Sequence, residues 1–411
     1  MIDSNFGSVH DYTKQIRHIK NWVLRLRRLR PKLETTWEEP ADWTNKFSNL
    51  HGSPAQTLTI TLTPTGCAWA SMGGCTMCGE FEGSTKGNNV SAEFHIAQFA
   101  SAVSKYVAKY NPTWLRIYQE GNYTNPDEIE PSAQLTILRL ASLIGGIKRI
   151  TVEAMAKYLT QERVQDLKNS ITRDVELEIG MGFEAENDVV RNVCINKGES
   201  INDFRRAVAL LKDAGIRSVA YVLLKPPFLT ENEAIEEAIA TIQLAHNIGF
   251  DAVSLQPVTI HGYSLVHALN TEGLYQLPWL WSVVKVAQSA RNIPDFRISA
   301  AGFYPRPMNV AYNRHPNGTD GCNETLWAAI KEYSKWHRFE ILESVDCTCK
   351  KEWEEACRVT EGPLHTRIDQ QLGRLDLDSY IRFISEGQLV RQPMVNRALA
   401  ADGGTQYPVD R

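Results

Sequence analysis

The feature that most constrains the fold of this chain is a regular alternation of short strand-like runs with segments of helical periodicity over residues 57–258. Alternation of this kind predicts parallel strands joined by right-handed helical crossovers. We therefore expect an α/β fold, a partial (β/α)6 TIM-like barrel with its helices outside the sheet. The expected strands cover residues 57–64, 113–120, 147–154, 175–182, 217–224 and 251–258.

The pattern changes on both sides of this core, which predicts three parts. Residues 1–50 are expected to form a basic helical extension, residues 51–304 the partial barrel, and residues 305–411 a C-terminal module with a second group of cysteines and a tail. The alternation weakens after about residue 260, and a loop rich in Pro, Asn and Gly at 304–322 leads into the module.

The cysteine content is informative because of the compartment that the chain is expected to occupy. No run approaches the ~20 apolar residues of a membrane span, and the N-terminus has no apolar signal segment. We therefore expect a cytoplasmic protein without a membrane span, and disulfides rarely persist in that compartment. Six of the eight cysteines lie in two sets, which indicates metal binding or redox chemistry.

The first set follows the first expected strand directly and has the pattern C-x7-C-x2-C, formed by Cys67, Cys75 and Cys78. Three thiolates on one loop can hold three irons of a [4Fe–4S] cluster and leave the fourth iron open for a substrate or cofactor. A structural zinc site needs a fourth ligand, and no further Cys or His lies nearby in the sequence. A zinc loop or redox-active cysteines are the alternatives.

Polar residues stand where the expected strands end, and in parallel barrels this edge of the sheet carries the reactive groups. Lys225 and Glu153 are the candidate catalytic residues, since a lysine buried at such a position is costly unless it has a partner. Gln256, at the end of the last expected strand, is a candidate cofactor-binding residue.

The second set comprises Cys322, Cys347 and Cys349, with His315 close in sequence. These cysteines are expected to bind a second, auxiliary [4Fe–4S] cluster, or zinc together with His315; buried thiols without metal are the third alternative. Cys357 stands outside the set, because it is about 12 Å farther along an expected helix. The isolated Cys194 is expected to be a small buried hydrophobic residue.

A basic segment stands out against a net charge of −4: residues 14–32 contain eight basic residues and no acidic one. Apolar residues at helical spacing within it predict a basic amphipathic helix. The helix could pack on the body with a solvated basic face, present a phosphate-binding face to RNA, or lie on a membrane surface.

Over about residues 57–358 the sequence resembles the radical S-adenosylmethionine (SAM) enzymes, and among them the radical-SAM subunit of archaeosine synthase and the Elp3-like proteins. The usual spacing in that superfamily is C-x3-C-x2-C, so the longer first gap here is a departure. The resemblance is carried, in order, by GCAWASMGGCTMCGE, LEIGMGFEAENDVVRNVCINKG, GIRSVAYVLLKPPFLTENEAI, FDAVSLQPVTIHGYSLV, LPWLWSVV and DCTCKKEW.

The resemblance implies a barrel of the radical SAM type, with a [4Fe–4S] cluster on the first three cysteines and SAM bound to its open iron. Glu184 and Arg191 would hold the ribose hydroxyls and the SAM carboxylate, although an ion pair between them is the alternative. Met77 would offer its backbone to the adenine. The SAM amino group would be contacted by the turn formed by Glu120, Gly121 and Asn122.

The resemblance also implies a reaction, by a lyase or transferase. A 5′-deoxyadenosyl radical would abstract hydrogen from a nucleoside or nucleobase, and in the archaeosine family it fragments a lysine-conjugated 7-deazaguanine in tRNA. The alternatives are an enzyme of natural-product biosynthesis that acts on a free nucleotide, with sulfur replacing oxygen, and a non-catalytic zinc scaffold. The expected partners are tRNA or a small molecule, an external electron donor of the flavodoxin or ferredoxin type, and a partner subunit.

Overall fold

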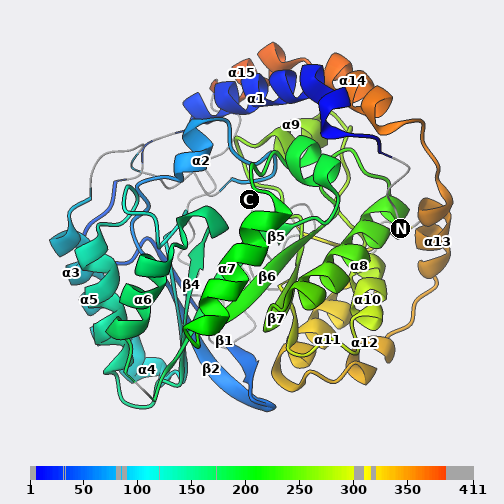
Figure 1. Ribbon diagram of the computed structural model, residues 1–411. Coiled ribbons are helices and arrows are strands. Elements are labelled where there is room, and N and C mark those ends of the chain that lie inside the picture. The colour runs from blue at the N-terminus through cyan, green and yellow to red at the C-terminus, as the bar shows by residue number, and fades with distance from the viewer. Residues whose placement is uncertain are drawn as a thin grey trace, which may run out of the picture.

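The computed structural model describes residues 6–30, 32, 34–79, 85, 90–119, 121–172, 174–299, 310–315 and 321–385. In this part of the chain a single curved sheet has eight strands in sequential order, and the helices lie around its outer face (Figure 1). The first strand pairs antiparallel with the second, and all later neighbours are parallel. The strands are β1 (Asp42–Leu50), β2 (Ser53–Thr61), β3 (Trp114–Tyr118), β4 (Arg149–Ala154), β5 (Glu176–Glu184), β6 (Arg217–Leu224), β7 (Ala252–Pro257) and β8 (Phe296–Ile298).

The crossover helices begin where the sequence supplies capping side chains. The hydroxyls of Ser91, Ser200 and Thr230 accept hydrogen bonds from the first turns of α3, α7 and α8, respectively. The helices are α1 (Thr13–Arg28), α2 (Ala68–Ser71), α3 (Ala92–Ala102), α4 (Ala108–Tyr110), α5 (Pro131–Ser142), α6 (Gln161–Ser170), α7 (Ile201–Asp213), α8 (Glu231–Ile248), α9 (Leu265–Thr271), α10 (Leu280–Ser289), α11 (Asn323–Trp336), α12 (Glu340–Glu343), α13 (Lys350–Arg358), α14 (Leu364–Arg374) and α15 (Leu377–Ser385). Short 3-10 turns lie at Val9–Tyr12 and Ala156–Tyr158, and π turns at Val103–Val107 and Val190–Cys194.

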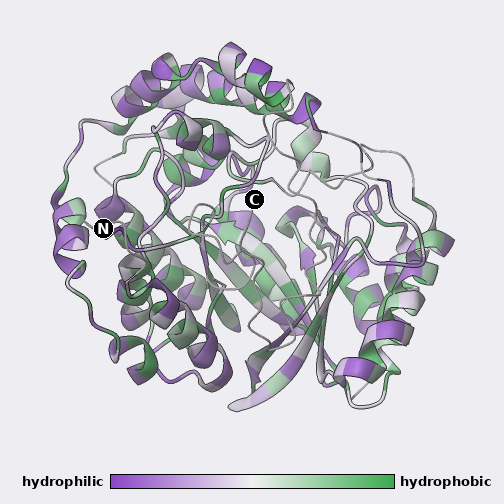
Figure 2. Cartoon of the chain, turned by 180° about the vertical axis from the view of Figure 1, so that it is seen from behind, coloured by the Kyte–Doolittle hydropathy of each residue, from purple (hydrophilic) through white to green (hydrophobic). Residues whose placement is uncertain are grey.

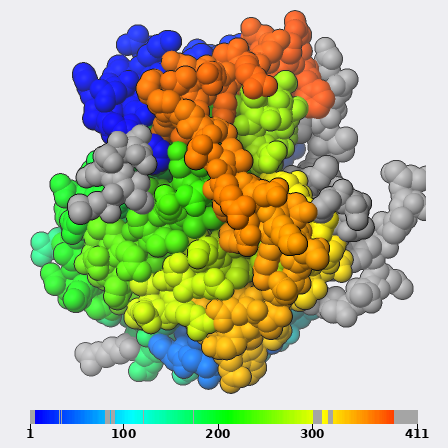
Figure 3. Space-filling view, turned by 90° about the vertical axis from the view of Figure 1, so that its right-hand side faces the viewer, coloured from blue at the N-terminus to red at the C-terminus, as the bar shows by residue number. Residues whose placement is uncertain are grey.

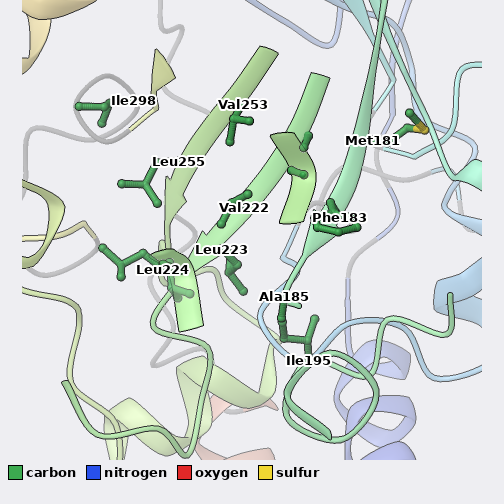
Figure 4. Close-up of a cluster of buried hydrophobic side chains, with 14 of the residues drawn as sticks. Met181, Phe183, Ala185, Ile195, Val222, Leu223, Leu224, Val253, Leu255 and Ile298 are labelled. Carbon is green, nitrogen blue, oxygen red and sulfur yellow. The ribbon is translucent and has the colours of Figure 1, made fainter. Parts of the chain in front are cut away.

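Successive side chains of each strand point to opposite faces of the sheet, and the two faces differ in character. The outer face is apolar and packs against the helices; Figure 4 shows Met181 and Phe183 of β5 with Val222 of β6 and Val253 of β7 in this layer. In Figure 2 hydrophobic residues concentrate on the strands, whereas many helices turn hydrophilic residues outward. The inner face is largely polar, so the barrel interior can bind polar groups.

A buried charge cluster fills the barrel interior near the beginnings of the strands. Glu178 is fully buried, and Arg297 donates two hydrogen bonds to its carboxylate at 2.8 and 2.9 Å. Arg149 and Arg217 approach the same carboxylate at 3.5 and 3.6 Å. Burial alone would raise the pKa of Glu178, but the surrounding arginines hold it well below its usual range.

Helix α11 bridges the two edge strands of the sheet. It packs against β1, β2 and β8. Asn49 of β1 donates a hydrogen bond to the Lys335 carbonyl at 2.9 Å, and the Tyr333 hydroxyl donates to the Phe296 carbonyl of β8 at 3.0 Å. Side-chain packing, rather than a backbone ladder, therefore joins β1 to β8 in the described part of the barrel.

Helices from the two ends of the chain meet on one side of the molecule. Figure 1 shows α1 beside α14 and α15, and Figure 3 shows the segment from α11 to α15 running along the surface to reach α1. The Gln15 amide donates to Asp369 at 3.1 Å, and Arg25 pairs with Asp378. The apolar face of α1 is buried, as the packed-helix alternative predicted. No helix among the described residues has the length and apolar character needed to cross a bilayer.

The predicted partial α/β barrel is confirmed, and all six expected strands are present as β2 to β7. The sheet also contains β1 and β8, which the alternation did not predict. β1 lies within the expected N-terminal extension and joins β2 through a tight hairpin in which His51 and Gly52 adopt left-handed φ values of 52° and 82°. The three-part division of the chain stays a prediction.

Candidate iron–sulfur and substrate site

The first cysteine set lies on a loop that neighbouring backbone holds in place. Cys67 precedes α2, directly after β2. The Thr76 hydroxyl and backbone N–H donate hydrogen bonds to the carbonyls of Cys194 and Ile195 at 2.7 and 2.9 Å. The Asn196 amide donates to the Gly74 carbonyl at 2.7 Å. The loop is therefore fixed against the turn that follows the π segment Val190–Cys194, where Cys194 is fully buried as expected.

Two arginines of the N-terminal basic segment contact the same loop. Arg27 donates to the Cys75 carbonyl at 3.1 Å, and Arg30 donates to the Cys78 carbonyl at 3.0 Å. A Cβ at Gly74, where φ is +70°, would stand 2.6 Å from the Arg27 guanidinium, so only glycine fits there. Part of the basic face therefore positions the cysteine loop. RNA binding by the remaining basic side chains stays a prediction.

The three cysteines of the first set lie near one another. Burial raises the pKa of Cys75, and the charges of Cys78 and Cys67 add to this rise. Three thiolates gathered on one loop can each bind a separate iron of a [4Fe–4S] cluster.

The electrostatic surroundings can compensate for the charge of bound thiolates. Burial raises the pKa of Cys75, and the Lys197 ammonium group opposes this rise. Burial alone would lower the pKa of Lys197, but the carboxylate of Glu184, 3.2 Å away, more than offsets it and raises that pKa. Glu184 ends β5 with a left-handed φ of 64° and pairs with Lys197, not with Arg191.

The expected SAM-binding turn is organised by a buried carboxylate that the sequence analysis missed. Glu128 accepts hydrogen bonds from the backbone N–H and side-chain amide of Asn122 at 2.5 and 2.8 Å, and from the Ala68 N–H at 2.9 Å. The Asn122 amide also lies 3.8 Å from the Cys67 sulfur. Gly121 lies so close to Glu128 that a Cβ would clash at 2.2 Å. Glu120 lies outside the described residues.

Three further predicted cofactor contacts occupy different environments. Met77 is partly buried against the core beside the cysteine loop. Gln256 is partly exposed on the inner face of β7, where its amide donates to Ser254 at 2.9 Å. Arg191 is fully buried, and its guanidinium donates to the backbone carbonyls of residues 185, 186 and 199 and to Asp188. These donors hold together the segment 185–199.

The barrel interior brings Glu153 together with two tyrosines that the sequence analysis did not select. The hydroxyls of Tyr118 and Tyr221 lie 3.4 Å apart. Burial, followed by the Glu153 charge, raises the pKa of Tyr118 to about 12, and burial raises that of Tyr221 well above its usual value. Both phenols are therefore neutral at physiological pH and can donate hydrogen bonds. Side chains alternate between the inner and outer faces along β3 and β6. Once the strand register is known, this alternation identifies Tyr118 and Tyr221 as inward-facing.

Lys225 forms an ion pair with a buried carboxylate, as expected for a lysine buried at the end of a strand. Its ammonium lies 2.5 Å from the carboxylate of Glu231, which also accepts a hydrogen bond from the Ser282 hydroxyl at 2.5 Å. Burial lowers the pKa of Lys225, and Glu231 opposes this. Lys225 itself has a left-handed φ of 63° at the end of β6. Such unfavourable conformations are often found at functional sites.

The structure also gathers the second cysteine set. The ligand atoms of His315, Cys322, Cys347 and Cys349 all lie within 4.8 Å of one another, and in the described chain no other group of metal-ligating side chains is this close. Cys357 is not a member, as its distance along the helix predicts. A surface hollow of about 420 Å³ borders Cys322 and Cys347.

A curved sheet whose first parallel strand, β2, leads into a loop with three cysteines is the arrangement expected of the radical SAM enzymes. Among solved structures, a radical SAM methyltransferase from Sphaerobacter thermophilus aligns with a TM-score of 0.40 and 15% identity, over 62% of this chain and 73% of that one. No protein-family model matches the chain.

The relatives found by sequence comparison point to a narrower group of proteins than the solved structures do. The chain is 29% identical over 348 residues to archaeosine synthase subunit beta of Methanosarcina acetivorans, which covers 84% of this chain and 98% of that protein. It is 28% identical over 315 residues to archaeosine synthase subunit beta of Thermococcus kodakarensis, covering 76% of this chain and 94% of that protein. The predicted resemblance to the archaeosine synthase radical-SAM subunit is confirmed.

Proposed function

We propose that this chain abstracts a hydrogen atom from a modified nucleobase in tRNA, in the manner expected of archaeosine synthase. The observation that carries the proposal is the similarity to archaeosine synthase subunit beta over 84% of the chain and 98% of the relative. Because those relatives are named as one subunit of a larger enzyme, we also propose that a partner subunit completes the active assembly. An external one-electron donor would reduce the iron–sulfur cluster.

In this proposal the cysteine loop holds the [4Fe–4S] cluster, with Cys67, Cys75 and Cys78 as its ligands. When bound, the cluster and SAM supply the 5′-deoxyadenosyl radical that removes hydrogen from the substrate. Arg27 and Arg30 fix the backbone of the loop, and the Lys197 ammonium balances the negative charge of the thiolates. The protein contributes orientation and charge, and the cofactors supply the reactive chemistry.

SAM is proposed to contact residues 120–122, Met77, Glu184 and Gln256. Asn122 is held by Glu128 beside the Cys67 sulfur, so its position is coupled to that of the cluster ligand. Glu184 and Lys197 offer opposite charges for the zwitterionic end of SAM. Arg191 is proposed to act by holding the segment that carries Glu199 and Lys197, because its own donors contact backbone carbonyls.

The substrate is proposed to enter the barrel interior and contact Glu153, Tyr118 and Tyr221. The carboxylate accepts hydrogen bonds and the two neutral phenols donate them, which suits the mixed donors and acceptors of a nucleobase edge. Lys225 directly follows β6 and pairs with Glu231 at the start of α8, and we propose that this pair contacts polar groups on the substrate. Lys225 and Glu153 therefore remain the proposed catalytic pair.

The test is anaerobic turnover of the cluster-loaded enzyme with SAM and dithionite, with and without tRNA that carries a lysine-conjugated 7-deazaguanine. We expect 5′-deoxyadenosine in the wild type, its loss in Cys75→Ala, and its retention in the control Cys357→Ala. Product in the tRNA should require the tRNA substrate and should rise when the partner subunit is added. Turnover of a free nucleotide, with none on tRNA, would contradict the proposed substrate and favour the natural-product alternative.

A further inference from the structure

We propose that His315, Cys322, Cys347 and Cys349 form a closed, tetrahedral zinc site rather than the site of an auxiliary iron–sulfur cluster. The Cys322 sulfur lies 3.7 Å from the Cys349 sulfur and 3.8 Å from the His315 ring nitrogen. Ligands on a tetrahedral zinc ion with Zn–S bonds of about 2.3 Å stand about 3.8 Å apart. Cysteines on a [4Fe–4S] cluster bind different irons around a bulky core and must stand farther apart.

The donor set and its surroundings fit zinc as well as the spacing does. Three thiolates and one imidazole complete a Cys3His site, and four protein ligands leave no open position, which is typical of structural zinc. The Trp281 N–H donates to the Cys349 sulfur at 3.2 Å, and the Asn313 amide donates to the Cys322 sulfur at 3.1 Å. Such donors stabilise and orient thiolate ligands.

The position of two ligands explains how a net negative site is tolerated. Cys322 immediately precedes α11 and Cys349 immediately precedes α13, so both sulfurs lie near the N-terminal end of a helix. The positive end of the helix dipole stabilises negative charge placed near it. The hollow that borders Cys322 and Cys347 gives an ion a route to the site from solvent.

The site would act by positioning α13 against the barrel, and this part of the inference rests on the proposed function. Helix α13 directly follows the proposed zinc ligand Cys349 and packs on α8. The Trp353 indole of α13 donates to the Ser282 hydroxyl at 2.9 Å, and Ser282 donates to Glu231, the partner of Lys225. The zinc ion would thus fix the position of Trp353 and, through Ser282, that of the Glu231 carboxylate that pairs with Lys225.

The test is metal analysis of the full-length protein purified without oxygen. We expect one zinc and about four irons per chain, in keeping with a single [4Fe–4S] cluster. Cys322→Ser should lose zinc and keep its iron, whereas the control Cys357→Ser should keep both metals. About eight irons without zinc, or full zinc in Cys322→Ser, would overturn the inference.

A milder variant covers the case in which Cys322→Ser fails to fold. Trp281→Phe keeps all four ligands and removes one hydrogen bond to sulfur, so zinc affinity measured by chelator competition should fall about 10- to 100-fold. Unchanged affinity would count against thiolate ligation by Cys349. A protein that binds zinc but produces no 5′-deoxyadenosine would refute the proposed function and support the zinc site. A protein that produces 5′-deoxyadenosine but contains no zinc would refute the zinc site and support the proposed function.

Discussion

Glu128 offers a sharp test of how the cysteine loop and the proposed SAM-binding turn are held together. Its two carboxylate oxygens accept five hydrogen bonds: from the Ala68 N–H, from the N–H and amide of Asn122, and from the amides of Asn125 and Gln119. In Glu128→Gln one oxygen becomes an NH2 group, which cannot accept. In either orientation of the new amide, its NH2 group faces the N–H donors of the neighbouring residues, so at least two of the five hydrogen bonds are lost.

Hydrogen bonds to a charged acceptor contribute about 1.5–3 kcal/mol each, so the loss is about 3 kcal/mol or more. Globular proteins unfold with an entropy of about 2.1 cal/mol/K per residue, and for a chain of 411 residues this predicts a melting temperature about 3–4 °C lower. Because Asn122 contacts Cys67, we also expect weaker SAM binding. Differential scanning calorimetry and SAM titration measure the two effects.

The matched control is Asp127→Asn, which removes a carboxylate from the adjacent, exposed position. It should change the melting temperature by less than 1 °C, since surface substitutions are usually within about 0.5 kcal/mol. If Glu128→Gln melts at the wild-type temperature, or if Asp127→Asn loses as much stability, the hydrogen bonds to Glu128 do not hold the turn.

Two further predictions concern other charged groups. Glu178→Gln should lower the free energy of unfolding by about 3–5 kcal/mol at pH 7, because three arginines lose their buried partner. The pKa of Glu178 in the folded chain lies below its unfolded value, so the stability that the carboxylate contributes is present above about pH 4.3 and is lost as the pH falls further. Urea titrations should therefore show that the difference in unfolding free energy between wild type and variant narrows below about pH 4. A difference that stays constant with pH would contradict this prediction. Arg27→Ala should reduce the iron retained after desalting, because the Cys75 carbonyl loses its donor, while Arg28→Ala, at an exposed position of α1, should not; equal losses would mean that helix stability, not the loop contact, matters.

The sequence was sufficient for features that repeat along the chain. Six parallel strands and the two cysteine sets follow from periodicity and spacing, which are local. The hairpin partner β1 was missed because its residues are mostly polar and only partly buried, so they do not alternate as in a core strand. Strand β8 has only three residues, too few for a periodic signal.

Features that depend on three-dimensional pairing could not be predicted in the same way. Glu128 lies six residues after Asn122 in sequence but folds back to accept its backbone N–H, and Lys197 pairs with Glu184 across a loop. Tyr118 and Tyr221 face each other only because β3 and β6 curve around a common interior. An ion pair between Glu184 and Arg191 was the alternative expected from the sequence; in the structure Arg191 is buried and donates to backbone carbonyls instead.

The bridge that α11 makes between β1 and β8 has a consequence for the size of molecule that the barrel can admit. A ring of strands fully joined by backbone hydrogen bonds has a circumference set by strand number and stagger. Here one seam consists of side chains, so its width depends on the volume of residues such as Leu326 and Ile330 on the buried face of α11. Exchanging those residues is a way to widen or narrow the interior while the parallel ladder from β2 to β8 stays intact.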